Sequence, residues 1–132
     1  MSLRPSLILA AAAAAASVLG ATTANAAPTD HQNCFLGRDW ESWSAPGDGD
    51  TILIRVGLRD IYRVDLTPGS HVRKDPDRFL ITKQRGSSWI CSPLDLDLQV
   101  ADHVGFRQPL IAKSLRKLTP QEVAAIPKKD LP

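Results

Sequence analysis

"TILIRVGLRDIYRVDL", residues 51–66, is the stretch that decides the fold. In each half, apolar residues alternate with others, which is the pattern of a β-strand that buries one face. The "GLRD" between the halves is a connection of hairpin length. The stretch therefore predicts an antiparallel hairpin with one apolar face. That face would carry Ile52, Ile54, Val56, Tyr62, Val64 and Leu66.

Short apolar or alternating runs continue outward from this hairpin, separated by turn residues about every 8–12 positions. We predict further strands at 39–43, 78–84, 88–92 and 94–100, and the segment 105–115 has room for one more pair. Alternation in the fourth of these places its apolar residues on the core side. They are Leu94, Leu96, Leu98 and Val100. A series of short strands of this kind is typical of a small antiparallel β domain.

One helix is predicted near the end, in "KLTPQEVAAIP", residues 117–127. Thr119 is a suitable N-cap, and Glu122 stands where a capping box needs an acid. Leu118 and Val123 have the spacing of a hydrophobic staple. Because so short a helix is marginal alone, it must dock on the sheet.

The first 26 residues, "MSLRPSLILAAAAAAASVLGATTANA", read as a bacterial signal peptide. A basic start at Arg4 is followed by an apolar run and then by Ala24-Asn25-Ala26, which suits signal peptidase. The run is short and Ala-rich, which disfavours a retained membrane span. We expect cleavage after Ala26 and a mature protein in the periplasm or outside the cell.

The remaining chain, residues 27–132, is expected to form a single β-rich domain. Its core would span about residues 34–126, and residues 127–132 would be a loose tail. The whole chain has a net charge of +2, and the signal removes one basic residue and no acidic one, which leaves +1. So small an excess argues against a nucleic-acid partner or an anionic membrane.

The chain has two cysteines, Cys34 and Cys91. Exported proteins with an even cysteine count usually pair them. Free thiols or metal ligands are the alternative, but a zinc site usually contains a close pair such as C-x-x-C, which this sequence lacks. We therefore predict one disulfide. The predicted fold is mostly β, a small antiparallel sandwich or barrel with a short C-terminal helix and this disulfide.

Sequence patterns for catalysis or metal binding are weak. Counted from Asp48 as a calcium loop, the fifth and twelfth positions are Ile52 and Arg59, which supply no ligand. The three histidines lack metal-ligand spacing, and no G-x-S-x-G, H-E-x-x-H or glycine-rich phosphate loop occurs. We therefore predict no catalytic residue, no metal ligand and no cofactor, although a site assembled across the fold leaves no local signature.

Trp40 and Trp43 are candidates for binding a partner. They are three residues apart, so a regular strand would point them to opposite faces and expose one. An exposed tryptophan can stack on a sugar or anchor a protein. The alternative is packing in the core or on the disulfide.

Arg55, Arg59 and Arg63 concentrate around the hairpin. They are candidates for binding an anionic group on a partner. The alternative is that they are solvated, with Arg59 and Asp60 paired across the turn.

Asp95 and Asp97 alternate with leucines and share the polar face of the predicted strand 94–100. A cation would need a third ligand, which the segment does not supply. We expect the two carboxylates to keep an edge strand soluble and unpaired. Contact with a partner is the alternative.

Four features occur in order: the N-terminal cysteine, "R-D-W-x-S-W", the hairpin ending in "IYRVDL", and "W-I-C" followed by an "L-T-P-Q-E" helix. Together they resemble a family of small exported bacterial proteins known only as a domain of unknown function. The resemblance spans roughly Cys34 to Ile126 and implies a β-rich fold and export, but no activity. Family members often carry further cysteines, one after the "YRVDL" strand and one before the helix, where this chain has none.

We expect an exported, non-catalytic binding or accessory module of the bacterial cell envelope, with an envelope protein or a glycan as partner. A small secreted hydrolase-like enzyme with a loop-assembled site is one alternative. An inhibitor of a secreted hydrolase is the other.

Overall fold

The computed structural model describes residues 33–73, 75–84, 86 and 88–132, and the predicted signal peptide lies outside them. The strands are β1 (Phe35–Leu36), β2 (Trp40–Ser44), β3 (Thr51–Val56), β4 (Asp60–Leu66), β5 (Arg78–Gln84), β6 (Trp89–Ile90), β7 (Leu96–Asp102), β8 (Arg107–Leu110) and β9 (Ala112–Lys117). The helical segments are η2 (Gly37–Asp39), η3 (Pro93–Asp95), α1 (Pro120–Ala125) and η4 (Lys128–Asp130).

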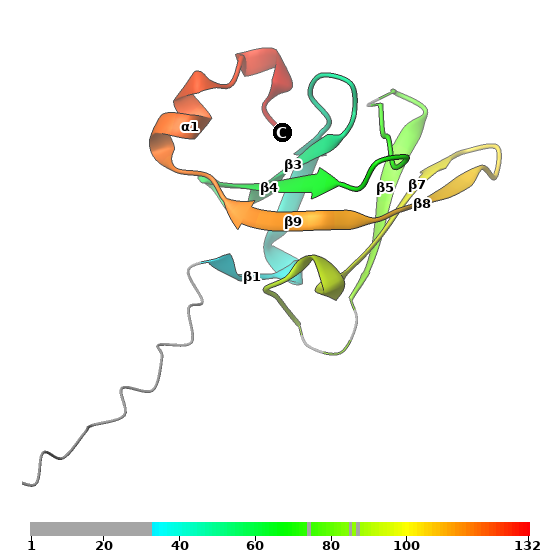
Figure 1. The fold of residues 1–132 in the computed structure, drawn as a ribbon, viewed down its shortest axis with the longest axis horizontal. Helices are drawn as coiled ribbons and strands as arrows, with labels where there is room; N and C mark the ends of the chain where they lie inside the picture. The colour runs from blue at the N-terminus through cyan, green and yellow to red at the C-terminus, as the bar shows by residue number, and fades with distance from the viewer. Residues whose placement is uncertain (1–32, 74, 85, 87) are drawn as a thin grey trace, which may run out of the picture.

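These strands form a sandwich of antiparallel sheets (Figure 1). One sheet has the order β2-β3-β4-β9 and the other the order β5-β7-β8, while β1 and β6 form a small pair of their own. The sheets do not close into a barrel. The predicted mostly-β fold is confirmed, as a sandwich with one short C-terminal α-helix.

The β3–β4 hairpin has the predicted alternation. Ile52 lies opposite Val64 and Ile54 lies opposite Tyr62, and all four side chains are buried. Their shared face forms one wall of the core between the two larger sheets. The buried residues of this core are Phe35, Ile52, Ile54, Val56, Tyr62, Val64, Leu66, Val72, Ile90, Leu96, Leu98, Val100 and Leu110.

A second, smaller core lies on the outer face of the four-stranded sheet. It contains Leu53, Ile61 and Leu118, with Val123 and Ile126 packed on them. The predicted helix supplies this cover. Its N-terminus has both predicted bonds of a capping box, because the Thr119 side chain accepts from the Glu122 N–H and the Glu122 carboxylate accepts from the Thr119 N–H.

The strand predicted at 94–100 begins two residues later than the alternation indicates. Ser92 and Asp95 form a capping box around Pro93, so the chain makes the short turn η3 before β7 starts at Leu96. Leu94, which was predicted to line the core, is therefore 86% exposed. The strand is also not an edge strand, because β7 lies between β5 and β8.

The last six residues lie against the sheet, whereas the sequence predicts a loose tail. Ser44 Oγ donates to the carbonyl oxygen of Asp130 at 2.6 Å. Arg55 Nε donates to the carbonyl oxygen of Pro132 at 2.8 Å, and its Nη2 donates to the same atom. Alternation explains the difference, since Ser44 and Arg55 both project from the outer face on which the chain returns.

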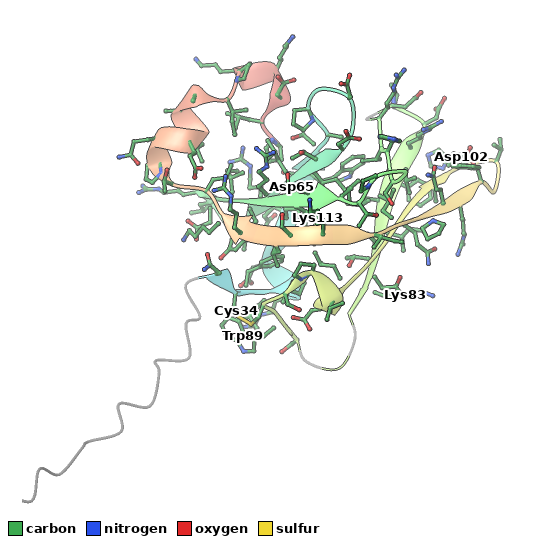
Figure 2. The ribbon with its side chains drawn as sticks, viewed as in Figure 1. Cys34, Asp65, Lys83, Trp89, Asp102 and Lys113 are labelled. Atoms are coloured by element: carbon green, nitrogen blue, oxygen red, sulfur yellow. A yellow bond between two sulfur atoms is a disulfide. The ribbon has the colours of Figure 1, made fainter. Side chains whose placement is uncertain are left out.

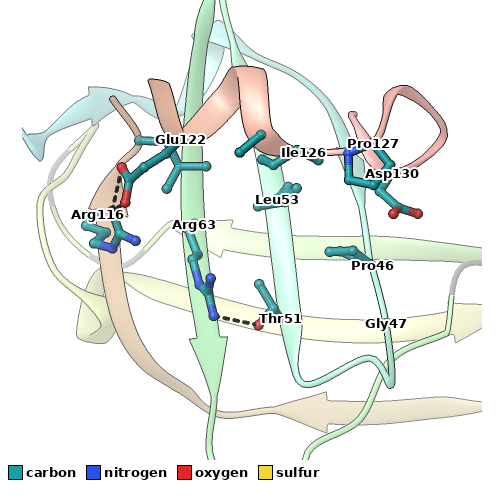
Figure 3. Close-up of a pocket in the computed structure, with 12 residues that line it drawn as sticks. Pro46, Gly47, Thr51, Leu53, Arg63, Arg116, Glu122, Ile126, Pro127 and Asp130 are labelled. Carbon is teal, nitrogen blue, oxygen red and sulfur yellow. Dashed lines mark hydrogen bonds and ion pairs between the residues drawn. The ribbon is translucent and has the colours of Figure 1, made fainter. Parts of the chain in front are cut away.

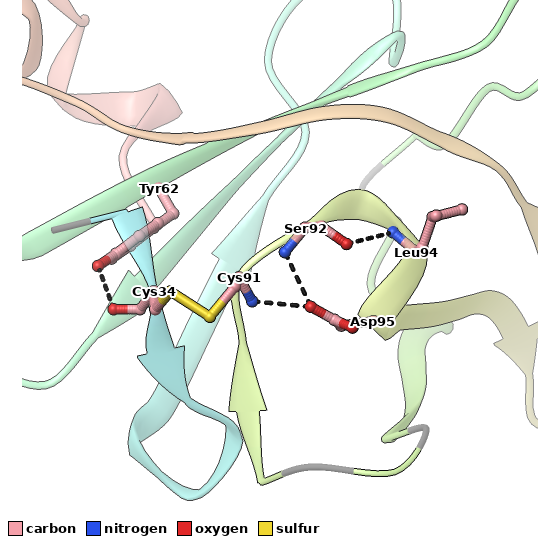
Figure 4. Close-up of a disulfide and its surroundings, with 6 residues drawn as sticks. All are labelled: Cys34, Tyr62, Cys91, Ser92, Leu94 and Asp95. Atoms are coloured by element: carbon pink, nitrogen blue, oxygen red, sulfur yellow. Dashed lines mark hydrogen bonds between the residues drawn. A yellow bond between two sulfur atoms is a disulfide. The ribbon is translucent and has the colours of Figure 1, made fainter. Parts of the chain in front are cut away.

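Cys34 and Cys91 form the predicted disulfide (Figure 4). It lies next to the β1–β6 pair, in which Phe35 is opposite Ile90. Tyr62 Oη donates to the carbonyl oxygen of Cys34 at 3.0 Å. The disulfide therefore ties the start of the fold to a residue 57 positions later, and the Tyr62 hydrogen bond ties it to the central hairpin. A structural disulfide is typical of a non-reducing compartment.

Candidate functional site

A pocket of about 460 Å³ lies on the outer face of the four-stranded sheet, beneath the C-terminal segment (Figure 3). We call it the outer-face pocket. Its lining residues are Pro46, Gly47, Thr51, Leu53, Arg63, Arg116, Leu118, Glu122, Ala125, Ile126, Pro127 and Asp130. The lining combines apolar side chains with two arginines and two acids. Sheet, helix and β2–β3 loop all contribute to it.

Strand pairing brings the two arginines together. Arg63 on β4 lies directly opposite Arg116 on β9, and both side chains project from the outer face. Like charges that face each other across strands are destabilising unless something offsets them. Each guanidinium has its own carboxylate: Arg63 Nε is 2.7 Å from Asp65 Oδ1, and Arg116 Nη1 is 2.9 Å from Glu122 Oε1.

Asp65 is the acceptor at the centre of a small network. Its carboxylate accepts from Arg63 Nε at 2.7 Å, Ser114 Oγ at 2.7 Å and Thr51 Oγ1 at 3.1 Å. Burial raises the pKa of Asp65, but these hydrogen bonds and the Arg63 charge outweigh it and hold the pKa below its ordinary value. Asp65 is therefore a fixed negative charge that orients Arg63.

Glu122 has two roles. It caps α1 through the Thr119 N–H at 2.8 Å, and it accepts from Arg116 Nη1 at 3.0 Å. The Thr119 N–H and then Arg116 lower the pKa of Glu122. The helix terminus thus holds the partner of the second arginine in place (Figure 3).

Apart from Thr51 and Asp130, the remaining surface of the pocket is apolar. Leu53 and Leu118 are only 3% and 7% exposed overall, because α1 covers them. Ile126 and Pro127, at the end of that helix, face Pro46 of the β2–β3 loop across the opening (Figure 3). A ligand in this pocket would meet the two arginines at one side and, apart from Asp130, mainly aliphatic groups at the other.

The predicted arginines are divided by the fold. Arg63 lines the outer-face pocket, whereas Arg55 holds the C-terminal segment. Arg59 lies in the β3–β4 turn and lines a hollow on the other side of α1. The alternative pairing of Arg59 with Asp60 does not occur among the described ion pairs, in which Asp60 accepts from Lys117 Nζ at 2.7 Å.

Both candidate tryptophans pack against the main core. Trp40 pairs with Val56 and Trp43 with Ile54, with a register shift between them. This bulge adds a residue to β2, so side chains three positions apart share the inner face. Trp40 and Trp43 are partly buried there, and neither is left on the opposite face as regular alternation predicts.

The candidate aspartates do not act as a pair on one strand. Asp95 belongs to η3, where its Oδ2 accepts from the N–H groups of Cys91 and Ser92, both at 2.9 Å (Figure 4). These two bonds lower the pKa of Asp95. Asp97 lies on β7, in register with Lys83 of β5. The first aspartate thus shapes the turn beside the disulfide.

A second exposed feature is the β7–β8 turn. Asp102 Oδ1 accepts from the N–H groups of Val104 and Phe106 at 3.0 and 2.8 Å, which fixes the turn (Figure 2). Val104 is 92% exposed and Phe106 45%. The Arg78 guanidinium lies 5.8 Å from the centre of the Phe106 ring. The turn therefore presents an apolar tip with a cation beside it.

Sequence reasoning missed Arg116 as a site residue and noted Glu122 only as a helix cap. The signal for Arg116 is its position in an alternating run, two residues before the apolar Leu118.

No group of three or more His, Cys, Asp or Glu side chains is placed to hold a metal within the described ranges. No family model, curated protein or solved structure matches this chain. In the part of the chain that the structure describes, no helix has the length and apolar character needed to cross a membrane.

Proposed function

We propose that this protein is an exported, non-catalytic binding module of the bacterial cell envelope, and that it binds its ligand in the outer-face pocket. The disulfide supports a compartment outside the reducing cytoplasm. The sequence of residues 1–26 supports export. An envelope protein or glycan that presents a small group to the pocket is the partner we expect.

The observation that carries this proposal is the directly opposed pair Arg63 and Arg116 in a pocket that also has apolar walls. Stability alone does not favour two adjacent cations in such a place. Two acids and a helix N-terminus are used to hold them, which is the kind of support that a binding site needs. A costly arrangement such as two adjacent, supported arginines is expected where function, and not only packing, selects the residues.

The state of the acids favours binding over turnover. A general acid or base works best when its pKa lies near the working pH. Asp65 and Glu122 have pKa values lowered from the ordinary acidic range, so both are ionised at neutral pH. They are suited to orienting the arginines.

The test is a binding screen by NMR on the exported protein, labelled with ¹⁵N. We would use a panel of small anionic, cationic and neutral compounds, including simple sugars. At least one class should shift the amide signals of Thr51, Arg63 and Arg116. The double variant R63Q/R116Q should lose these shifts.

Arg38→Gln is the matched control. Its side chain is 80% exposed and lies 3.7 Å from Asp39, outside the pocket. This variant should bind as the unchanged protein does. If no compound moves the pocket signals, or if the shifts persist in R63Q/R116Q, the pocket is not the binding site.

A further inference from the structure

The chemical class of the ligand can be inferred if, as proposed above, the outer-face pocket is the binding site. We propose that the outer-face pocket binds a monovalent organic carboxylate that carries an apolar group. Its carboxylate lies between Arg63 and Arg116, and its apolar group lies against Ile126 and Pro46. In this placement, the carboxylate is the only polar group that the ligand needs.

The guanidinium groups have donors left for a ligand. Arg63 uses Nε for Asp65 and directs Nη2 to Thr51 at a long 3.5 Å. Arg116 uses Nη1 for both oxygens of Glu122. Arginine has five N–H donors in a planar fork, and that fork matches the two oxygens of a carboxylate. Within the described residues, Arg63 Nη1 and Arg116 Nε and Nη2 make no such bond, so these three nitrogens can serve the ligand.

The local charge disfavours an anion of more than one negative charge. Asp65 and Glu122 already offset one guanidinium each. Asp130, a further acid, also lines the pocket. The two guanidinium groups and these three carboxylates sum to 2 − 3 = −1, so a divalent phosphate would be repelled about twice as strongly as a monovalent anion. A single carboxylate needs only the directional donors, which the arginines retain.

The apolar walls favour a ligand with an aliphatic group. Leu53 and Leu118 form a floor that α1 already covers, so the accessible apolar surface is that of Pro46, Ile126 and Pro127. The volume of about 460 Å³ is that of a small-molecule site. A bare anion would leave this apolar surface in contact with water, whereas an aliphatic group of several carbons would bury it.

Two sources share this chemistry: a free alkyl carboxylate, and the C-terminus of a peptide that ends in an apolar residue. Octanoate represents the first and N-acetyl-leucine the second. N-acetyl-leucinamide keeps the leucine side chain but removes the charge. Inorganic phosphate supplies charge without an apolar group.

Titrations of the exported protein, followed by the ¹⁵N signals of Arg63 and Arg116, test the inference. Octanoate or N-acetyl-leucine should bind at least tenfold more tightly than N-acetyl-leucinamide and than phosphate. The tighter of the two carboxylates identifies the source. In the Arg116→Lys variant, which keeps the charge but loses the planar fork, carboxylate affinity should fall about tenfold.

The thermal midpoint of each variant is measured alongside, so that loss of binding is separated from loss of fold. Arg38→Gln is again the control and should keep full affinity. Equal binding of the amide, or tighter binding of phosphate, would overturn the carboxylate assignment while leaving the pocket as a binding site. The assignment also fails if neither carboxylate shifts the pocket signals and another compound in the panel does. If no compound shifts them, the proposed function itself fails.

Discussion

At the scale of single residues, Asp65 organises the outer face of the sheet. Three donors from three strands, Thr51, Arg63 and Ser114, converge on its carboxylate. The same-strand pair of Arg63 and Asp65 is possible because residues two apart on a strand share a face. The position of Arg63 in the pocket thus depends on one acid that the ligand need not touch.

Substituting Asp65→Asn should lower the free energy of unfolding by about 1 kcal/mol at pH 7, since the group is only partly buried. The folded-state pKa of Asp65 lies below its ordinary value. Its contribution is therefore complete above the unfolded pKa of about 3.9 and is lost as the pH falls through the lower folded pKa. The variant should lose less stability than the unchanged protein between about pH 5 and pH 2. Urea unfolding across this pH range measures both effects.

Asp48→Asn is the matched control for this substitution, because Asp48 is an exposed residue of the β2–β3 turn. Its stability should stay within about 0.5 kcal/mol of the unchanged protein. Glu122 and Asp95 also have lowered pKa values, so a reduced acid dependence should persist in the Asp65 variant. An acid limb that is identical with and without Asp65 would contradict the network described above.

At the scale of elements, two segments with the same signature behave alike. "TPQE" at 119–122 and "SPLD" at 92–95 both place an N-cap residue, a proline and then an acid three residues after the cap. Both make capping boxes. We predicted the first from the sequence and missed the second, because leucine alternation in "LDLDLQV" suggested a longer strand. The capping signature of residues 92–95 was present in the sequence, and it determined the local structure in place of the leucine alternation.

Other features of the elements have no local signal. Whether β2 contains a bulge depends on how it pairs with β3, and it is this pairing that turns Trp40 and Trp43 to one side. The pocket depends on β4 pairing with β9, which brings Arg63 and Arg116 together from distant positions. Alternation predicts the faces of each strand but not the order of strands in a sheet. Arg63 and Arg116 can therefore each be assigned to a strand face from the sequence, but their direct pairing cannot.

Leu53→Ala tests the docking of α1 on the sheet. Leu53 is 3% exposed on an outer face that would otherwise be solvated, and it packs with Ile61, Leu118, Val123 and Ile126. Removing the side chain should cost about 2–4 kcal/mol of unfolding free energy. Denaturant unfolding followed by circular dichroism measures it.

Leu58→Ala provides the comparison within the same hairpin. Leu58 is 92% exposed in the β3–β4 turn, so its replacement should change stability by no more than about 0.5 kcal/mol. Equal effects of the two substitutions would mean that α1 does not depend on this leucine for its place on the sheet.

At the scale of the whole molecule, the predicted signal peptide lies outside the described fold. The described fold begins close to Cys34, well after the predicted cleavage at Ala26. We expect the N-terminal residue of the protein recovered from the exported fraction to be Ala27, as read by N-terminal sequencing. Recovery of a chain that begins at Met1 or Ser2 would contradict the signal peptide.

The disulfide provides the last prediction. It joins Cys34, at the start of the sandwich, to Cys91, which directly follows β6. The β1–β6 pair beside it has only two residues in each strand, so it needs support from outside its own hydrogen bonds. Closing a loop of this length stabilises a fold by on the order of 4 kcal/mol, which is a large share of a small domain's 5–15 kcal/mol.

The double variant C34S/C91S should therefore unfold roughly 15–30 °C lower than the unchanged protein. Thermal unfolding with and without a reductant measures this, and reductant should lower the midpoint of the unchanged protein while leaving that of the variant in place. Thiol titration of the denatured, unreduced protein should find no free thiol. A midpoint that falls by less than about 5 °C would mean that the hydrophobic core, and not the covalent link, holds β1 against the hairpin, since a shift of that size corresponds to only about 1 kcal/mol.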